Sequence, residues 1–189
     1  SGSGSLSLAA GQEYTGETQV SLGSLRLLGD LTSTSNIIVE AGGSLVNAAG
    51  ALELGSELTN RGLLDLGGAT DSVSLASEVI FEPAAELAVT VNDQAQASLL
   101  SAGNNRVLLD NIVVSITPSP GLYDSIETYE IIEAFEICTP DFCDFNGGTQ
   151  GIGTTAPDFA FLEIGPLTVQ PRDGGTQRLT FTLVQNANR

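Results

Sequence analysis

Residues 23–66 read "GSLRLLGDLTSTSNIIVEAGGSLVNAAGALELGSELTNRGLLDL" and contain the pattern that decides the fold. A glycine, any residue and a leucine recur at intervals of 19, 20 and 19 residues. The copies begin at Gly4, Gly23, Gly43 and Gly62, with an intermediate copy at Gly50. Each copy alternates apolar and polar residues over about five positions, the period of a strand with one buried face. A repeat of this length indicates stacked units rather than an ordinary domain.

The repeat predicts an all-β fold, a right-handed parallel β-helix with coils of about 19–20 residues. Each coil would pair its backbone with the coils above and below and point its aliphatic side chains into a shared core. The residues expected to point inward are Leu6, Leu8, Leu25, Leu27, Ile37, Val39, Leu45, Leu52, Leu54, Leu64 and Leu66. Three asparagines near turns, Asn36, Asn47 and Asn60, are expected to be ordinary turn residues; the alternative is stacking or a left-handed backbone.

Strand-like alternation continues to about residue 118, where "TPSPGLYDS" interrupts it with two prolines and a glycine. We therefore divide the chain into β-helix coils over residues 1–118 and a C-terminal cap over residues 119–189. Within the cap, "ETYEIIEAFEI" has strand character, and "LEIGPLTVQ" and "RLTFTLV" are joined by the turn-forming "PRDGG". These runs predict a cap built on a β-hairpin and resembling a β-sandwich.

Composition excludes many functions. Six basic residues, all arginine, stand against 23 acidic residues, which gives a formal charge of −17. Binding to nucleic acid is not expected because nothing here neutralises phosphates. Without histidine or lysine the chain cannot form a Ser-His-Asp site, a His-ligated metal site or a Schiff base. We expect no cofactor and no catalytic site in this chain.

Cys138 and Cys143 lie in "CTPDFCDF" and are spaced for a small local disulfide loop, which indicates an oxidising compartment. Two free thiols in a surface loop are the alternative. The same stretch offers Asp141, Asp144 and Asn146 before two glycines, and hard cations such as calcium favour clustered oxygen ligands. Because the spacing does not match a helix-flanked calcium loop, a polar surface turn is the favoured interpretation.

The N-terminal stretch from Gly4 to Gly29, "GSLSLAAGQEYTGETQVSLGSLRLLG", resembles the passenger-associated transport repeat of bacterial autotransporters. That repeat has a Gly-x-Leu-x-Leu strand, a Tyr-Thr-Gly-x-Thr turn and a second Gly-x-Leu-x-Leu strand. The matching residues are Tyr14, Thr15, Gly16, Thr18, Gly23, Leu25 and Leu27.

The C-terminal part is similar to the autochaperone, or junction, region at the end of autotransporter passengers. "TYEIIEAFEI" occupies the place of a family strand, and "FAFLEIGPLTVQPRDGGTQRLTFTLVQN" that of the family hairpin, with Ile164 where the family commonly has proline. The residues that the resemblance assigns to the folding core of the cap are Tyr129, Ile131, Phe161, Leu162, Leu167, Val169, Leu179, Phe181 and Leu183.

The resemblance implies a route of secretion. Such a passenger crosses the periplasm, threads through a C-terminal outer-membrane β-barrel translocator and folds outside the cell from its C-terminal end. The first residues, "SGSGSLSLAAG", lack a signal-peptide pattern, and we expect the chain to belong to a longer precursor. The expected location is the bacterial cell surface or the extracellular medium, and the expected partners are the barrel and the upstream passenger coils.

The cap would act as a folding template, because a solenoid grows by adding coils to an existing edge. It would nucleate the β-helix and present an upstream effector. The alternative for the same residues is the core of an end cap with no kinetic role.

Two other functions are weighed. An adhesin or self-association surface would use the long side of the solenoid to bind a host or sister-cell ligand. A carbohydrate-active β-helix enzyme would need two acids at a set separation, usually with a cationic helper. The acids of the repeats recur with the strand period as solvent-facing partners of the leucines, so catalysis is not expected. They are Asp30, Glu40, Glu53, Glu57 and Asp65.

Overall fold

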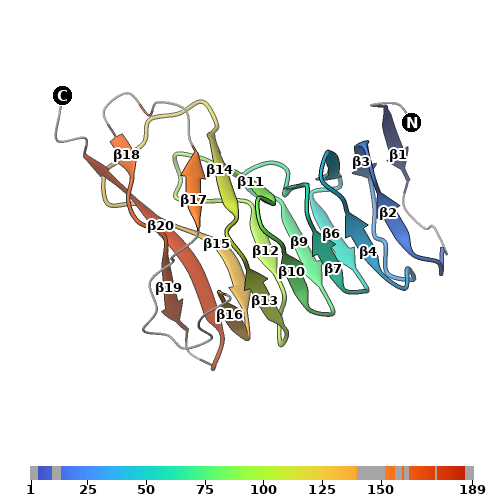
Figure 1. Cartoon of the computed structure of the whole chain (residues 1–189). Helices are drawn as coiled ribbons and strands as arrows, with labels where there is room; N and C mark the ends of the chain where they lie inside the picture. The colour runs from blue at the N-terminus through green and yellow to red at the C-terminus, as the bar shows by residue number, and fades with distance from the viewer. Residues whose placement is uncertain are drawn as a thin grey trace.

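The computed structural model of the protein describes residues 4–9, 14–139, 152–155, 159, 162–172 and 174–185. Within these ranges all regular structure is β-strand. In this described part of the chain we find no helix with the length and apolar character needed to cross a membrane. The strands lie side by side in an elongated stack, with the N-terminal strands at one end and the C-terminal strands at the other (Figure 1).

Parallel strands form most of three sheets. Sheet A contains, in order, β1 (Ser5–Leu8), β3 (Gly23–Leu27), β5 (Gly43–Asn47), β8 (Leu63–Asp65), β11 (Glu86–Val91), β14 (Val113–Pro118) and β17 (Gly153–Thr155). Sheet B contains β2 (Thr18–Val20), β4 (Ile37–Val39), β7 (Leu58–Asn60), β10 (Val79–Phe81), β13 (Arg106–Leu109) and β16 (Glu136–Cys138).

Sheet C begins with four parallel strands, β6 (Ala51–Leu54), β9 (Ser72–Leu75), β12 (Leu99–Ser101) and β15 (Thr128–Ala134). It ends with three strands in antiparallel pairing, β18 (Leu162–Ile164), β19 (Thr168–Pro171) and β20 (Gln177–Gln185). The fold is therefore all-β and mainly parallel.

From β5 to β17 the chain visits sheets A, C and B in a fixed cyclic order. In sheet A, Leu25 lies beside Leu6 and Leu45, and Leu45 lies beside Leu64, so the early repeat is 19 or 20 residues as predicted. The next steps, from Leu64 to Leu87 and from Leu87 to Val114, are 23 and 27 residues. The predicted period is therefore right at the N-terminal end and too short further on, where the connecting turns are longer.

The core is a continuous row of aliphatic side chains from alternate strand positions. Nine of the eleven residues predicted to point inward, from Leu25 to Leu66, are buried, and Leu8 is half-buried against the core. Leu6 pairs with the buried Leu25 and so lies on the same face of sheet A, but its side chain is 61% exposed. β1 is the outermost strand of sheet A, so within the described residues only β3 covers this layer.

Three of the repeated glycines, Gly23, Gly43 and Gly62, stand where successive repeats approach each other too closely for a side chain. A Cβ at Gly23 would lie 2.3 Å from the Gly4 carbonyl oxygen, and one at Gly62 would lie 2.3 Å from that of Gly43. At Gly43 itself the distance to the Val20 oxygen would be 2.1 Å. The copy at Gly50 differs: it precedes β6 in sheet C, and a Cβ there would lie 3.8 Å from its nearest neighbour, Asp71 Oδ1. Its φ of 88°, like the 79° of Gly23, is in the left-handed region that favours glycine.

The pairing changes character toward the C-terminus. Residues 119–127, where the sequence pattern breaks, contain no strand. Parallel pairing continues beyond them, since β15, β16 and β17 pair with β12, β13 and β14. Antiparallel pairing involves β18 to β20. The division into residues 1–118 and 119–189 stays a prediction.

Candidate functional site

The C-terminal cap is organised around β20, the longest strand among the described residues. One edge of β20 pairs with β15, and the other pairs first with β19 and then with β18. Figure 1 shows this strand lying obliquely across the end of the stack. Because β20 runs antiparallel to β15, the parallel series of sheet C stops here.

An aromatic pair forms the centre of the cap. Tyr129 and Phe181 are opposite each other in the β15–β20 register, and their rings stack with centroids 5.0 Å apart and planes 14° apart. Both side chains are at most 1% exposed. The Tyr129 hydroxyl lies 2.6 Å from Glu127 Oε2, to which it donates, and 3.1 Å from the carbonyl oxygen of Asn92. Burial, followed by the hydrogen bond to Glu127, raises the pKa of Tyr129 far above its ordinary value.

The structure brings most of the predicted cap residues together. Tyr129, Ile131, Leu167, Leu179, Phe181 and Leu183 are buried, and Leu162 and Val169 are half-buried against the same core. Phe161 lies outside the described residues.

Sequence reasoning missed two features of this core. A register shift between Glu130 and Ile132 allows both Ile131 and Ile132 to be buried. Gln177 is buried, and its side-chain oxygen accepts a hydrogen bond of 2.6 Å from the Ile137 backbone N–H. A period-2 hydrophobic pattern has no signal for either a bulge or a buried amide.

Ion pairs connect the β19–β20 hairpin to β15. Arg172 Nη1 lies 2.7 Å from Glu133 Oε1 and 3.2 Å from Glu130 Oε1. Arg178 Nη1 lies 3.7 Å from the other oxygen of Glu130. Because these side chains are between 26% and 44% exposed, solvent screens the pairs and each contributes about 1 kcal/mol or less. The pairs therefore add little to the stability of the protein. Their effect is to favour one position of the hairpin against β15.

The N-terminal repeat motif is a hydrogen-bonded turn. The Tyr14 hydroxyl donates to the Glu17 carbonyl oxygen at 2.6 Å, and the Thr34 hydroxyl donates to that of Gly16 at 2.7 Å. Thr18 Oγ1 lies 3.1 Å from Thr34 Oγ1, and Thr15 is exposed. The motif continues into β3, which supplies Gly23 and the buried Leu25 and Leu27. These contacts hold the turn in shape and bring no reactive groups together.

A groove of about 700 Å³ lies at the N-terminal end, between β1, β2 and the start of β3. Its lining includes Leu6, Tyr14, Val20, Leu22 and Leu25. Leu6 and Leu22 are 61% and 57% exposed. This end of the molecule therefore presents apolar surface beside open strand edges.

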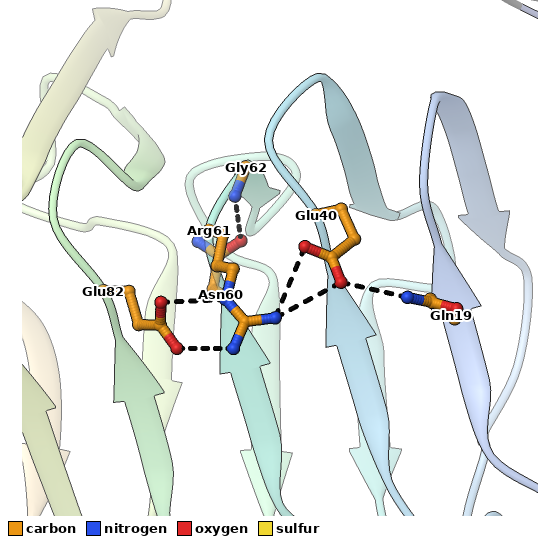
Figure 2. Close-up of polar contacts among 6 residues, drawn as sticks. All are labelled: Gln19, Glu40, Asn60, Arg61, Gly62 and Glu82. Atoms are coloured by element: carbon orange, nitrogen blue, oxygen red, sulfur yellow. Dashed lines mark hydrogen bonds and ion pairs between the residues drawn. The ribbon is translucent and has the colours of Figure 1, made fainter.

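Charged side chains form a ladder where the sheet B strands end (Figure 2). Arg61 donates to both oxygens of Glu82, at 2.8 and 2.6 Å, and to both oxygens of Glu40, at 3.2 and 3.3 Å. Gln19 Nε2 donates to Glu40 Oε1 at 2.9 Å. The hydrogen bonds from Arg61 lower the pKa of the Glu82 carboxyl below its ordinary value. The recurrence of these residues every 21 positions, visible in the sequence, is the signal that was missed.

The local chain explains why Arg61 faces outward between its partners. The Asn60 side chain is buried, donates to the Glu86 carbonyl oxygen at 3.2 Å and accepts from the Gly62 backbone N–H at 3.1 Å. Gly62 follows at a position with no room for a Cβ. The turn after β7 is therefore fixed on both sides of Arg61 (Figure 2).

The three asparagines act through their side chains, and two of them are not ordinary turn residues: Asn47 and Asn60 are the buried last residues of β5 and β7. The Asn47 amide lies 2.9 Å from the Gly50 carbonyl oxygen and 3.1 Å from that of Leu66. Neither Asn36, Asn47 nor Asn60 has a positive φ, so the left-handed alternative is wrong for all three. Among the described asparagines, Asn111 adopts that conformation, with φ 48°.

Two of the carboxylates considered as catalytic acids accept backbone hydrogen bonds, Asp30 from the strand β6 and Asp65 within its own turn. Asp30 Oδ1 accepts from the Glu53 backbone N–H at 2.8 Å, and Asp65 Oδ1 accepts from that of Gly67 at 2.9 Å. No group of three or more His, Cys, Asp or Glu residues able to hold a metal is found among the residues that the structure covers.

Cys138 at the end of β16 is disulfide-bonded. Cys143, the other cysteine of the predicted pair, lies outside the described residues, as do Asp141, Asp144 and Asn146 of the weighed calcium site.

Comparison with known proteins finds no family model and no curated protein that matches the chain. The function is therefore argued from the fold and its surfaces.

Proposed function

We propose that the three sheets are the faces of a right-handed parallel β-helix, and that the chain is the C-terminal stalk and folding template of an autotransporter passenger. The cyclic order of the strands and their parallel pairing support the helical path. Parallel crossover connections are right-handed in almost all proteins, which supports the handedness. The resemblance of both ends of the sequence to autotransporter motifs supports the family.

The observation that carries the proposal is the difference between the two ends of the stack. At the C-terminal end, β20 covers the edge of β15 with antiparallel pairing and a buried aromatic pair. At the N-terminal end, β1 and β2 are the outermost described strands of their sheets and lie beside an apolar groove. The covered edge belongs to sheet C, since β17 and β16 are the outermost described strands of sheets A and B at the C-terminal end. A covered edge is a formed layer from which pairing could start, and an open edge accepts the next coil.

The proposal assigns partners to each end. Upstream passenger coils would continue the sheets from β1 and β2. An outer-membrane β-barrel would receive the chain beyond the cap, and the passenger would reach the cell surface or the medium. The disulfide at Cys138 is consistent with passage through an oxidising compartment such as the periplasm. The effector activity would belong to the upstream part of the passenger, and catalysis is not assigned to this chain.

Hydrogen exchange of the intact protein tests the template role. The amides of β15 and β20 should be the last to exchange, and those of β1 to β4 the first, because a nucleus opens only with the whole structure. Fast exchange in β20 with slow exchange in β3 and β5 would contradict the proposal.

Refolding of shortened chains gives the second test. A chain ending at Thr155, which lacks β18 to β20, should fail to refold from denaturant or refold far more slowly. The matched control begins at Gly23 and lacks β1 and β2, and it should refold at a rate close to that of the intact chain. If both shortened chains refold equally well, the cap is an end structure with no kinetic role.

A further inference from the structure

The outer face of sheet B carries a row of three aliphatic side chains and one threonine. Strands β4, β7 and β10 have three residues each, with the first and third facing the core, so the middle residue faces outward. In four neighbouring strands the outward residues are in register, because Ile38 pairs with Thr59, Thr59 with Ile80, and Ile80 with Leu108. We call these four residues the sheet B stripe; Ile38, Ile80 and Leu108 are half-buried, and Thr59 between the two isoleucines is buried.

Charged residues line both sides of the stripe. One row lies at the start of the strands, either just before the first strand residue or at it, and the other follows the strands. Together they hold six carboxylates and two guanidinium groups. The first row is Glu57, Glu78, Arg106 and Glu136, and the second is Glu40, Arg61, Glu82 and Asp110.

Ion pairs within the rows leave an excess of negative charge. Arg106 pairs with Glu78 at 3.2 Å, and Arg61 bridges Glu40 and Glu82. Neither arginine removes the excess, because two positive charges face six negative ones. The stripe is therefore an apolar surface between two acidic rows.

The outer faces of sheets A and C differ from this arrangement. In sheet A the outward Val46 pairs with Asp65, and Leu63 pairs with Glu86. In sheet C the outward Leu99 pairs with Ser72, and Ser74 lies between Glu53 and Ser101. Carboxylates lie beside the aliphatic residues of sheet A, and serines with a glutamate occupy the face of sheet C, whereas the sheet B stripe contains three aliphatic residues and one buried threonine.

The dimensions of the stripe correspond to an α-helix. Strands lie about 4.8 Å apart, so four strands give an apolar length of ~14 Å, which three turns of helix cover. The two rows are four residues apart along a strand, as Glu57 and Arg61 are, a separation of ~13 Å at about 3.3 Å per residue. An α-helix with its side chains is about 10–12 Å wide.

We propose that the sheet B stripe docks a cationic amphipathic α-helix of a partner protein. The apolar side of the helix lies along Ile38, Thr59, Ile80 and Leu108, and lysine or arginine residues on both of its flanks meet the two acidic rows. This surface is separate from the cap and from the N-terminal groove, and the inference does not depend on the proposed folding role.

Charge complementarity selects this occupant over others. A second copy of the chain carries a formal charge of −17 and would bring a like-charged face against these rows. Anionic membranes and nucleic acids would be repelled in the same way. A positively charged amphipathic helix is attracted by both acidic rows and also buries the stripe. A charged helix without an apolar side has the electrostatic attraction alone.

The test measures binding of a synthetic peptide to the intact protein at about 150 mM salt, where long-range attraction is screened. The probe is a helical peptide of about 14 residues with leucine on one side and lysine on both flanks of that side, labelled for fluorescence anisotropy. A peptide of the same composition with its leucines scattered around the helix is the matched control. The amphipathic peptide should bind at least tenfold more tightly than its control.

A pair of variants places the contact. Ile80→Lys should weaken binding of the amphipathic peptide at least tenfold, because it puts a like charge in the centre of the stripe. Ser74→Lys adds the same charge to the outer face of sheet C and should change affinity less than twofold. Ile80→Thr with Ser74→Thr repeats the comparison without a new charge, in case Ile80→Lys does not fold.

Three results would overturn the inference. The amphipathic peptide could fail to bind; it could bind no better than its control, which shows attraction to net charge alone; or the Ile80 and Ser74 variants could weaken binding equally.

Discussion

The repeats and the cap achieve burial in opposite ways. In the repeats each layer copies its neighbour, so Leu25, Leu45 and Leu64 occupy equivalent places in one sheet. In the cap each contact occurs once, as with the Tyr129–Phe181 stack and the buried amide of Gln177. A stack of equivalent layers has no preferred starting point, whereas a set of unique contacts has one. The difference explains why a template would be placed in the cap.

The sharpest challenge to this comparison uses two buried phenylalanines. Phe181→Ala in the cap and Phe81→Ala in the repeats each remove a side chain that is at most 1% exposed, and each should cost about 3–5 kcal/mol of stability. If the cap forms first, Phe181→Ala mainly slows folding and Phe81→Ala mainly speeds unfolding. Folding and unfolding rates against denaturant concentration distinguish them, and the reverse assignment would place the nucleus in the repeats.

The next largest effect concerns the glycines that define the repeats. Gly43→Ala would place a Cβ 2.1 Å from the Val20 oxygen, so neighbouring layers must separate, and we expect a loss of about 2–3 kcal/mol. Gly4→Ala is the control because nothing lies within 4 Å of its Cβ, and it should change stability by about 0.5 kcal/mol or less. Urea midpoints of the two variants measure the difference. Equal midpoints would mean that the repeat glycines are not required for close stacking.

Alkaline pH should loosen the cap before the repeats. Burial raises the pKa of Tyr129 in the folded protein, so the folded state keeps the proton at a pH where the unfolded state releases it. The stability from this residue is complete below the ordinary tyrosine pKa of 10.0 and is lost as pH rises above it. Tyr129→Phe should flatten the fall of the melting temperature above pH 10, at the cost of about 1 kcal/mol at neutral pH from the missing hydrogen bond. An unchanged alkaline slope would contradict the assignment.

The smallest effect concerns the hydrogen-bonded ladder of Glu40, Arg61 and Glu82 in sheet B. Arg61 lowers the pKa of Glu82, so the stabilisation from this pair is present above pH 4.5, the ordinary value, and is lost as pH falls through the lower folded value. Glu82→Gln should lower the melting temperature by about 1–2 °C at pH 7, and the difference should disappear in strong acid. Glu133→Gln is the corresponding variant in the cap, where it removes a carboxylate partner of Arg172. Thermal melts across pH would contradict the prediction if the Glu82 difference grew as pH fell.

The repeats were predictable from the sequence because their information is local. Alternation within five residues identified the inward leucines, and the spacing of the glycines gave the 19–20 residue period of the first strands. Gly23, Gly43 and Gly62 mark places where neighbouring layers come too close for a side chain, so a geometric constraint between layers appears as a pattern along the chain. The proline and glycine break after residue 117 likewise marked the strand-free segment over residues 119–127.

Tertiary structure decided what depends on partners far away in the sequence. Leu6 has the same pattern as Leu25 but remains exposed, because burial requires a neighbouring layer as well as an inward direction. The bulge between Glu130 and Ile132 follows from pairing with β20, a strand nearly 50 residues later. The sheet B stripe needs the register of four strands, and no local window contains that register. Alternation fixes which face a residue takes, while long-range pairing fixes which residues share that face and what covers them.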